Sequence, residues 1–302
     1  MDNCKLLLMV ISSNTYPAMR NSKAQQKIYK KKDNDFQAYW YRGIEKNRQL
    51  NKSFELKNQD LILDCSDDSR QMGQKTLQAF EWALHNVNFQ YLIRPTPSSY
   101  VNLDYIEKLI DDDFFKNEIV YAGTIHSIKD KDETKKFFIS GSTLILNRKC
   151  VELIVENKTQ WNHDYWDDVA LADLLQNLDI EPIDLPRTDI KGNPFKQNIQ
   201  IDNYQFRCRS DNHYYYPRVI EANVLKVLDD IVLKKNISLL RKFLLNLYFE
   251  TAKVFYIYQF SWKMYTFLRK TAKKIIPDLI YKKLKNLLLS QITKFKHKRF
   301  KY

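Results

Sequence analysis

Residues 1–32 read MDNCKLLLMVISSNTYPAMRNSKAQQKIYKKK, and this stretch sets the class of fold. The six apolar residues 6–11 are too few for the core of a signal peptide and match a buried strand. Apolar side chains at helical spacing then predict a helix over 18–32. A buried strand followed directly by a helix is the repeating unit of an α/β protein, so we expect a largely parallel sheet flanked by helices.

The same alternation continues to about residue 220. Short apolar runs predict four further strands, at 61–63, 91–93, 119–122 and 142–146. Amphipathic spacing predicts four further helices, at 73–86, 103–112, 148–156 and 167–177. Ligands of an open sheet of this kind bind beyond the carboxyl ends of its strands.

After about Glu221 every segment has a helical period, and the charge changes with it. Residues 237–302 contain 16 Lys and Arg against two acids, a net charge of +14. Because the whole chain carries +13, residues 1–236 sum to −1. We therefore expect an α/β domain over 1–221 and a basic, all-helical region over 222–302.

The cysteines are widely spaced and form no CxxC pair, which argues against a zinc site and against a disulfide framework. They are Cys4, Cys65, Cys150 and Cys208. We expect reduced thiols in a protein that stays in the cytosol, where it is made.

Separated segments match, in order, the landmarks of one enzyme family. They begin with VISSNTYPAMRNSKAQQKIY and LILDCSDDSRQMGQKTLQAFEW, followed by YLIRPTPSSYVNLDYIEKLI. The last are FFISGSTLILNRKCVELI and WDDVALADLLQNLDIEPIDL. In this order they resemble the fringe and β-1,3-galactosyltransferase family of GT-A glycosyltransferases: its first strand, turn and Arg-bearing helix, its DFxDSYxNLTLKT stretch, its strand ending at an acidic turn, its small-residue loop and its EDV element near the acceptor. The resemblance implies a Rossmann-like GT-A fold and transfer of a sugar from a nucleotide-sugar donor to a glycan hydroxyl.

Thr96, Pro97 and Ser98 stand where that family has three aspartates. GT-A enzymes usually neutralise the diphosphate leaving group with a divalent cation held by this turn, and hydroxyl groups hold such a cation poorly. The resemblance therefore implies a metal-independent enzyme with no cofactor besides its sugar nucleotide, for which a UDP-sugar is expected. The acidic run at 111–113 falls at a helix end and is expected to be a solvated face.

The EDV-like element supplies the candidate general base. The resemblance places Asp168 beside the acceptor hydroxyl, with Asp167 in the position of the motif's glutamate. An inverting transfer deprotonates that hydroxyl as it attacks the anomeric carbon, so a carboxylate is required there. The alternative is structural, because an acid at a helix start is favoured by the helix dipole.

The resemblance also implies a set of donor contacts. A late basic segment offers Arg207, Arg209, His213 and Arg218 as a diphosphate clamp, since guanidinium groups fit phosphate oxygens. The other candidate contacts are Ser12, Ser13, Arg20, Asp64, Asp67, Lys75, Arg94, Thr96, Ser98, Ser99, Ser140 and Gly141. Asp67 or Asp68 is equally placed to cap the helix that follows.

The basic region predicts attachment to a membrane surface. Its apolar stretch at 239–267 is interrupted by polar and charged residues, so no run is long enough to span a bilayer. An apolar stripe with flanking lysines at 275–294 is typical of a helix lying on anionic lipid. We expect residues 237–302 to hold the protein at the inner face of the cell membrane, where it extends a surface or lipid-linked glycan.

Three alternatives stay open. In the first, the apolar stripe at 275–294 packs against protein instead of lipid. In the second, the basic aromatic run KFKHKRFKY at 294–302 binds nucleic acid. We expect no nucleic acid, because a long amphipathic stripe precedes that run. The third alternative is a catalytically inactive GT-A-like domain that binds a glycan or a nucleotide.

Overall fold

A computed structural model describes residues 2–30, 35–45, 49–129, 135–209 and 218–253. The chain divides into two compact units, Met1–Phe249 and Glu250–Tyr302. All described strands belong to the first unit. The predicted stripe at 275–294 and His213 lie outside the described residues.

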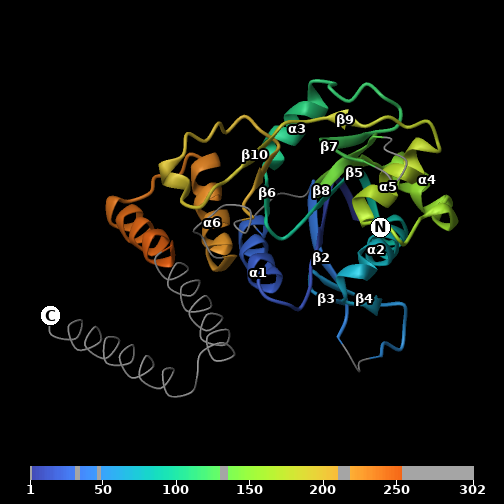
Figure 1. Ribbon diagram of the computed structural model, residues 1–302, viewed down its shortest axis with the longest axis horizontal. Helices are drawn as coiled ribbons and strands as arrows, with labels where there is room; N and C mark the ends of the chain where they lie inside the picture. The colour runs from blue at the N-terminus through green and yellow to red at the C-terminus, as the bar shows by residue number, and fades with distance from the viewer. Residues whose placement is uncertain (1, 31–34, 46–48, 130–134, 210–217, 254–302) are drawn as a thin grey trace, which may run out of the picture. The chain divides into compact units, whose positions relative to one another are not determined.

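An eight-stranded mixed sheet forms the centre of the first unit (Figure 1). Its strands are β1 (Asp2–Ile11), β2 (Phe36–Ile44), β3 (Phe54–Lys57), β4 (Asp60–Ser66), β5 (Val87–Pro95), β7 (Tyr121–Lys129), β8 (Lys135–Asn147) and β9 (Ile183–Asp184). They are arranged in the order β3-β4-β2-β1-β5-β8-β7-β9. Only β3 and β8 run against the other six, which confirms the predicted largely parallel sheet.

Helices cover both faces of this sheet, as Figure 1 shows. One face packs against α2 (Met72–Asn86), α4 (Arg148–Glu156) and α5 (Asp167–Gln176), and the other against α1 (Ala18–Tyr29) and α3 (Leu103–Asp111). Four 3₁₀ turns are also described: η1 (Ser69–Gln71), η2 (Lys158–Gln160), η3 (Pro194–Lys196) and η4 (Arg218–Ile220). The five helices predicted from periodicity are therefore confirmed, with α1 ending at Tyr29 instead of residue 32.

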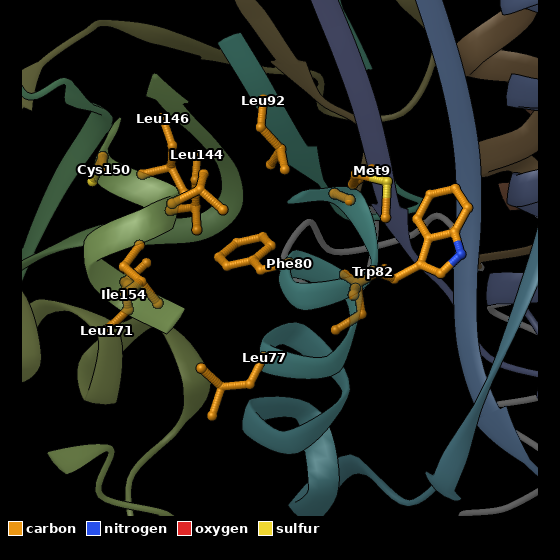
Figure 2. Packing of buried hydrophobic residues seen from close by; sticks show 14 of the residues in the cluster. Met9, Leu77, Phe80, Trp82, Leu92, Leu144, Leu146, Cys150, Ile154 and Leu171 are labelled. Carbon is orange, nitrogen blue, oxygen red and sulfur yellow. The ribbon is translucent and has the colours of Figure 1, made fainter. Parts of the chain in front are cut away.

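The central position of β1 explains its uninterrupted apolar run. Side chains alternate across a strand, so Leu7 and Met9 enter the core under α2 while Leu6 and Leu8 enter the core under α1. Figure 2 shows Phe80 of α2 projecting toward the strand and helix residues of the first of these cores. A strand buried on both faces has no polar face to show in its sequence.

Sequence reasoning missed β2, although it lies next to β1 in the sheet. Its sequence FQAYWYRGI mixes aromatic, polar and small residues, so neither strict alternation nor an apolar run stands out. Trp40 and Tyr41 are nonetheless buried, one in each core. Their large apolar area supplies what the missing aliphatic residues would have contributed.

A second sheet lies beside the carboxyl end of β5. It has three strands in the order β10-β11-β6, namely β6 (Ser99–Val101), β10 (Arg187–Asp189) and β11 (Gln205–Arg207). The antiparallel pairing of β6 with β11 places Arg207 opposite Ser99. Two segments about a hundred residues apart in the chain thereby meet directly after the turn at 96–98.

The compact unit continues past residue 221, where the sequence predicts the end of the α/β domain. The helix α6 (Glu221–Val232) buries Val224, Leu225 and Leu228 and packs against α1, and the compact unit extends to Phe249. The helical period after residue 221 is real, but this first helix uses its apolar face to cover the α/β domain. Helical character alone therefore does not mark the start of a separate region.

Residues 239–249 are helical and carry exposed apolar side chains. These are Leu239, Leu240, Phe243, Leu244 and Leu247, with Leu239 exposing 87% of its surface. Their spacing puts them on one face of the helix. Within the described part of the chain, no helix has both the length and the apolar character needed to cross a bilayer.

Candidate active site

A cleft of about 720 Å³ opens at the carboxyl ends of β1 and β5. Its walls come from the last residue of β1, the turn at 96–98, the middle of β8, the start of α5 and the end of β11. The lining residues are Ile11, Ser69, Met72, Arg94, Thr96, Pro97, Ser98, Ile128, Phe138, Ser140, Gly141, Ser142, Trp166, Asp167, Asp168, Val169, Arg207, Arg209 and Arg218. This is the sheet edge at which the sequence predicts a ligand.

The cleft brings together nine of the predicted site residues: Arg94, Thr96, Ser98, Ser140, Gly141, Asp167, Asp168, Arg207 and Arg209. Arg218, which the sequence offered for the clamp, lines it as well. Ser12, Ser13, Arg20, Asp64, Asp67, Lys75 and Ser99 are not among its lining residues. Trp166 was missed as a site residue, because nothing in the sequence signals that its ring is exposed.

Asp168 lies in the first turn of α5 and presents a half-buried carboxylate to the cleft. The Gly141 N–H donates to Asp168 Oδ2 at 2.8 Å, and the Val169 N–H donates to Oδ1 at 3.0 Å. A Cβ at position 141 would come within 3.0 Å of that Oδ2, so glycine permits the close approach. The carboxylate is therefore oriented by two backbone donors while it still faces the cavity.

Asp167 is paired with a buried arginine. The Arg94 guanidinium donates to the Asp167 carboxylate, and both side chains are almost fully buried. The other guanidinium bonds go to the Tyr41 hydroxyl at 3.1 Å, the Gly141 carbonyl at 2.9 Å and the Thr76 hydroxyl at 3.3 Å. Every nitrogen of Arg94 thus has a protein partner, and the pair ties the start of α5 to β5 and β8.

The turn at 96–98 is held from both sides. The Thr96 N–H donates to the Ser142 carbonyl at 2.9 Å, and the Cys208 N–H donates to the Ser98 carbonyl at 2.7 Å. The Ser98 hydroxyl donates to Oε2 of Glu221, which is completely buried, at 2.8 Å. The conformation of this turn therefore depends on α6 and β11, which lie far along the chain.

Glu221 is the acid beside this turn, and its oxygens already accept several bonds. Arg218 Nε donates to Oε1 at 2.8 Å, while Asn21 Nδ2 donates to Oε2 at 2.6 Å. Among the described residues, no three His, Cys, Asp or Glu side chains gather as a metal site would require. Two hydroxyl groups and one carboxylate that is already bonded do not fit a divalent cation.

The cationic wall comes from the end of β11 and the segment that follows it. Arg207 is the last residue of β11, and Arg209 lies two residues later. Both line the cleft, while Cys208 between them is buried. Arg218 joins them, and its Nη2 donates to the Ser98 hydroxyl at 3.2 Å.

His126 on β7 lies within the electrostatic reach of Arg207. Desolvation of the imidazole, together with the neighbouring Arg187 and Arg207 guanidinium groups, holds the pKa of His126 below its ordinary value. The Asp189 and Asp168 carboxylates act in the opposite direction. At His126 the two guanidinium groups therefore outweigh the two carboxylates.

Asp67 and Lys75 form a bridge outside the cleft lining. The Asp67 carboxylate accepts from the Asn14 N–H at 2.8 Å, the Gly43 N–H at 3.2 Å and Lys75 Nζ at 3.2 Å. Asn14 follows β1, Gly43 lies near the end of β2, and Lys75 belongs to α2. One carboxylate therefore joins three elements. Asp68 caps the short turn η1 that precedes α2, whereas the N-cap of α2 itself is Gln71, which makes no side-chain capping bond.

The other predicted donor contacts lie outside the cleft lining, and the serines among them bind other groups of the protein. The Ser12 hydroxyl bonds the Ser22 hydroxyl at 2.7 Å, and Ser13 bonds Thr15 at 2.6 Å. Arg20 and Asp64 are exposed, and Ser99 is buried. The Ser99 hydroxyl donates to the Ser142 carbonyl at 2.8 Å and so supports the turn from beneath.

Comparisons with known proteins give structural similarity only. No protein-family model and no curated protein matches this chain. Its fold is similar to that of a glycosyltransferase involved in glycosylation of the major capsid of PBCV-1, with 10% identity, 74% of this chain and 99% of that chain covered, and a TM-score of 0.40.

Two further solved structures are similar over 77% of this chain. The galactosyltransferase LgtC, solved with donor and acceptor sugar analogs, has 10% identity, 98% of its own chain covered and a TM-score of 0.43. The glycosyltransferase GlyE of Streptococcus pneumoniae TIGR4 has 11% identity, 64% of its chain covered and a TM-score of 0.39. Similarities of this size assign no substrate and no residue role, and the resemblance to the fringe family stays a prediction.

Proposed function

We propose that this chain is a GT-A glycosyltransferase that moves a sugar from a nucleotide-sugar donor to a hydroxyl group of a glycan, with inversion at the anomeric carbon. One observation carries the proposal. A single cleft at the carboxyl ends of the strands holds the oriented Asp168 carboxylate on one wall and Arg207, Arg209 and Arg218 on the other. A carboxylate base facing an arginine cluster matches the needs of transfer from a diphosphate leaving group.

In the proposed reaction Asp168 accepts the proton of the acceptor hydroxyl as its oxygen attacks the anomeric carbon. The bond from that carbon to the diphosphate oxygen breaks, and its electron pair leaves with the nucleoside diphosphate. The proton ends on Asp168, and the new glycosidic bond forms on the face opposite the leaving group. The two backbone N–H groups orient the Asp168 carboxylate and so hold it in place for the acceptor hydroxyl.

Arg207, Arg209 and Arg218 hold the diphosphate in this scheme, with the Thr96 hydroxyl at the rim. Charge-assisted bonds from guanidinium groups to phosphate oxygens are among the strongest that proteins make. Arg218 is pre-oriented by the buried Glu221, which accepts from its Nε at 2.8 Å. In this scheme arginines neutralise the charge of the leaving group, and no step uses a metal ion.

The direct test is a panel of nucleotide sugars, assayed first for thermal stabilisation and then for transfer to simple glycosides. UDP-sugars are expected to raise the melting temperature, and at least one is expected to be consumed. Stabilisation without hydrolysis or transfer would instead favour a GT-A-like binding protein. No stabilisation by any nucleotide sugar would remove the proposal.

We further propose that the protein acts at the inner face of the cell membrane on a surface or lipid-linked glycan. Five exposed apolar side chains on the helix at 239–249 support this, because soluble proteins rarely leave such a face uncovered. Arg241 and Lys242 on the same helix, and the net charge of +14 over 237–302, add attraction to anionic headgroups.

Flotation with lipid vesicles tests this part. Binding is expected to vesicles that contain anionic lipid, with only partial release at high salt, because salt screens charge but not apolar contact. Replacing Leu239, Leu240, Phe243 and Leu244 by serine is expected to make release complete. The matched control replaces Leu56 and Phe114, two exposed apolar residues elsewhere, and is expected to bind normally.

A further inference from the structure

Trp166 is an exposed tryptophan inside the cleft. It exposes 62% of its surface, and it lines the cavity together with Asp168, two residues later. The other four tryptophans include Trp40, Trp82 and Trp161, which are buried. Burial of an indole contributes a large hydrophobic stabilisation. Because the Trp166 ring is exposed, it contributes little to the stability of the fold.

The backbone beneath Trp166 is firmly placed. It is the residue that precedes α5, and its carbonyl accepts from the Ala170 N–H at 2.8 Å. The next residue, Asp167, is bound to the buried Arg94 guanidinium. The indole is therefore mounted on an anchored helix start while its ring remains open to solvent, which suits a surface prepared for a ligand.

The neighbouring wall is partly apolar. Met72, Ile128, Phe138 and Val169 line the same cavity. An aromatic face with a carboxylate nearby fits a pyranose ring, because the ring's C–H groups lie on the electron-rich indole face while its hydroxyl groups reach polar partners. A phosphate or a nucleoside diphosphate would instead require the arginines of the opposite wall.

We propose that Trp166 is the platform on which the pyranose ring of the acceptor stacks, so that one of its hydroxyl groups reaches Asp168. This rests on the proposed glycosyl transfer and adds the acceptor subsite to it. Trp166 then determines acceptor affinity, while Asp168 performs the proton transfer and the arginine wall holds the donor.

The first test needs no activity. The full chain is labelled with fluorinated tryptophan, and the Trp166 resonance is identified by its loss in Trp166→Phe. Titration with methyl pyranosides of glucose, galactose and N-acetylglucosamine is expected to shift this resonance saturably with at least one sugar. Mannitol, an open-chain polyol without a ring face, is expected to leave it in place.

A Trp166 resonance that no pyranoside moves would overturn the inference. A resonance that moves with UDP-sugar and not with pyranosides would also overturn it, by assigning the ring to the donor. Phe114→Ala removes an exposed aromatic residue away from the cleft lining and is expected to leave the pyranoside shift unchanged.

The second test uses transfer, once a donor and an acceptor are found. Trp166→Ala is expected to raise the acceptor KM by about tenfold or more, with donor KM and kcat at saturating acceptor within about twofold. Trp166→Phe keeps an aromatic face and is expected to restore most of the affinity. An unchanged acceptor KM in Trp166→Ala would sink the inference and leave the transferase standing, whereas wild-type protein without any transfer would refute the proposed function itself.

Discussion

The two walls of the cleft carry opposite charge and come from different parts of the chain. The start of α5 supplies Asp167 and Asp168. The other wall consists of Arg207 at the end of β11, Arg209 after it and Arg218 in the turn before α6. On each wall a buried ion pair holds a charged residue in place: Arg94 holds Asp167, and Glu221 holds Arg218. The two walls therefore share one means of support, although they carry opposite charge and come from distant segments of the chain.

The adjacent residues Asp167 and Asp168 differ in burial and in the partners that their carboxylates bind. Asp167 is buried and bound to an arginine, while Asp168 is half-buried and accepts from two backbone N–H groups. A helix turns by about 100° per residue, so neighbouring side chains at its start face different surroundings. The acid facing the core and the acid facing the cleft are therefore expected to respond differently to the same substitution.

The largest effect is expected from Asp168→Asn. Removing the proposed base should lower kcat by about 10²–10⁴-fold, while donor affinity measured by calorimetry stays near that of the wild type. Asn can still accept from the Gly141 N–H, so the melting temperature should change little. Asp173→Asn, on the same helix, is the control and should turn over normally. Normal turnover by Asp168→Asn would remove this residue from the mechanism.

Breaking the buried pair should act on stability instead. Arg94→Met leaves Asp167 buried without its cation and is expected to cost about 3–5 kcal/mol of unfolding free energy. Chemical denaturation measures this cost. The double variant Arg94→Met with Asp167→Leu should recover a good part of it, since it removes both charges. Equal costs for the single and double variants would mean that the charge pair is not what anchors α5.

The cationic wall should show a smaller effect on donor binding. Arg207→Gln and Arg209→Gln are each expected to weaken binding of a UDP-sugar by about tenfold, the size of one charge-assisted bond. Lys23→Gln, which removes an exposed charge on α1, is the control. His126 gives an independent reading by NMR: its pKa should rise in Arg207→Gln and also when inorganic pyrophosphate binds, because both remove cationic field. A pKa of His126 that falls on adding pyrophosphate would contradict the clamp.

The smallest effect is expected from chelation. Because arginines are assigned to neutralise the leaving group, EDTA should leave the rate of transfer within about twofold of its starting value. Added Mn²⁺ should not raise it further. Loss of transfer in EDTA and recovery with Mn²⁺ would show that the cationic wall is not sufficient by itself.

The main elements were predictable because their signals are local. The β1 run needs only its six apolar residues, and α4 was predicted with the bounds that the structure has. The position of Asp168 was also found from sequence, since the element WDDVALADLL carries it on a helix start. By contrast, β2 was missed because its burial comes from two aromatic residues in a mixed sequence.

The roles of individual site residues were less accessible. Asp67 and Lys75 looked like donor contacts, yet they join the ends of three elements outside the cleft lining. Ser99 was named beside Ser98, but the two hydroxyl groups point to different partners. The type and spacing of residues indicate which chemistry is possible. The hydrogen-bond partner of each polar side chain comes from elsewhere in the chain, so the sequence pattern does not reveal it.

The sequence by itself determined an α/β fold, a cationic end of the chain and a cleft at the carboxyl ends of the strands. Periodicity and charge suffice for these features, because each depends on neighbouring residues. Only the tertiary structure decided that Arg94 neutralises Asp167, that Glu221 holds Ser98 and Arg218, and that Trp166 remains exposed. The Arg94–Asp167 and Ser98–Glu221 contacts join residues 73 and 123 positions apart, and such long-range pairing is set by the packing of the whole sheet.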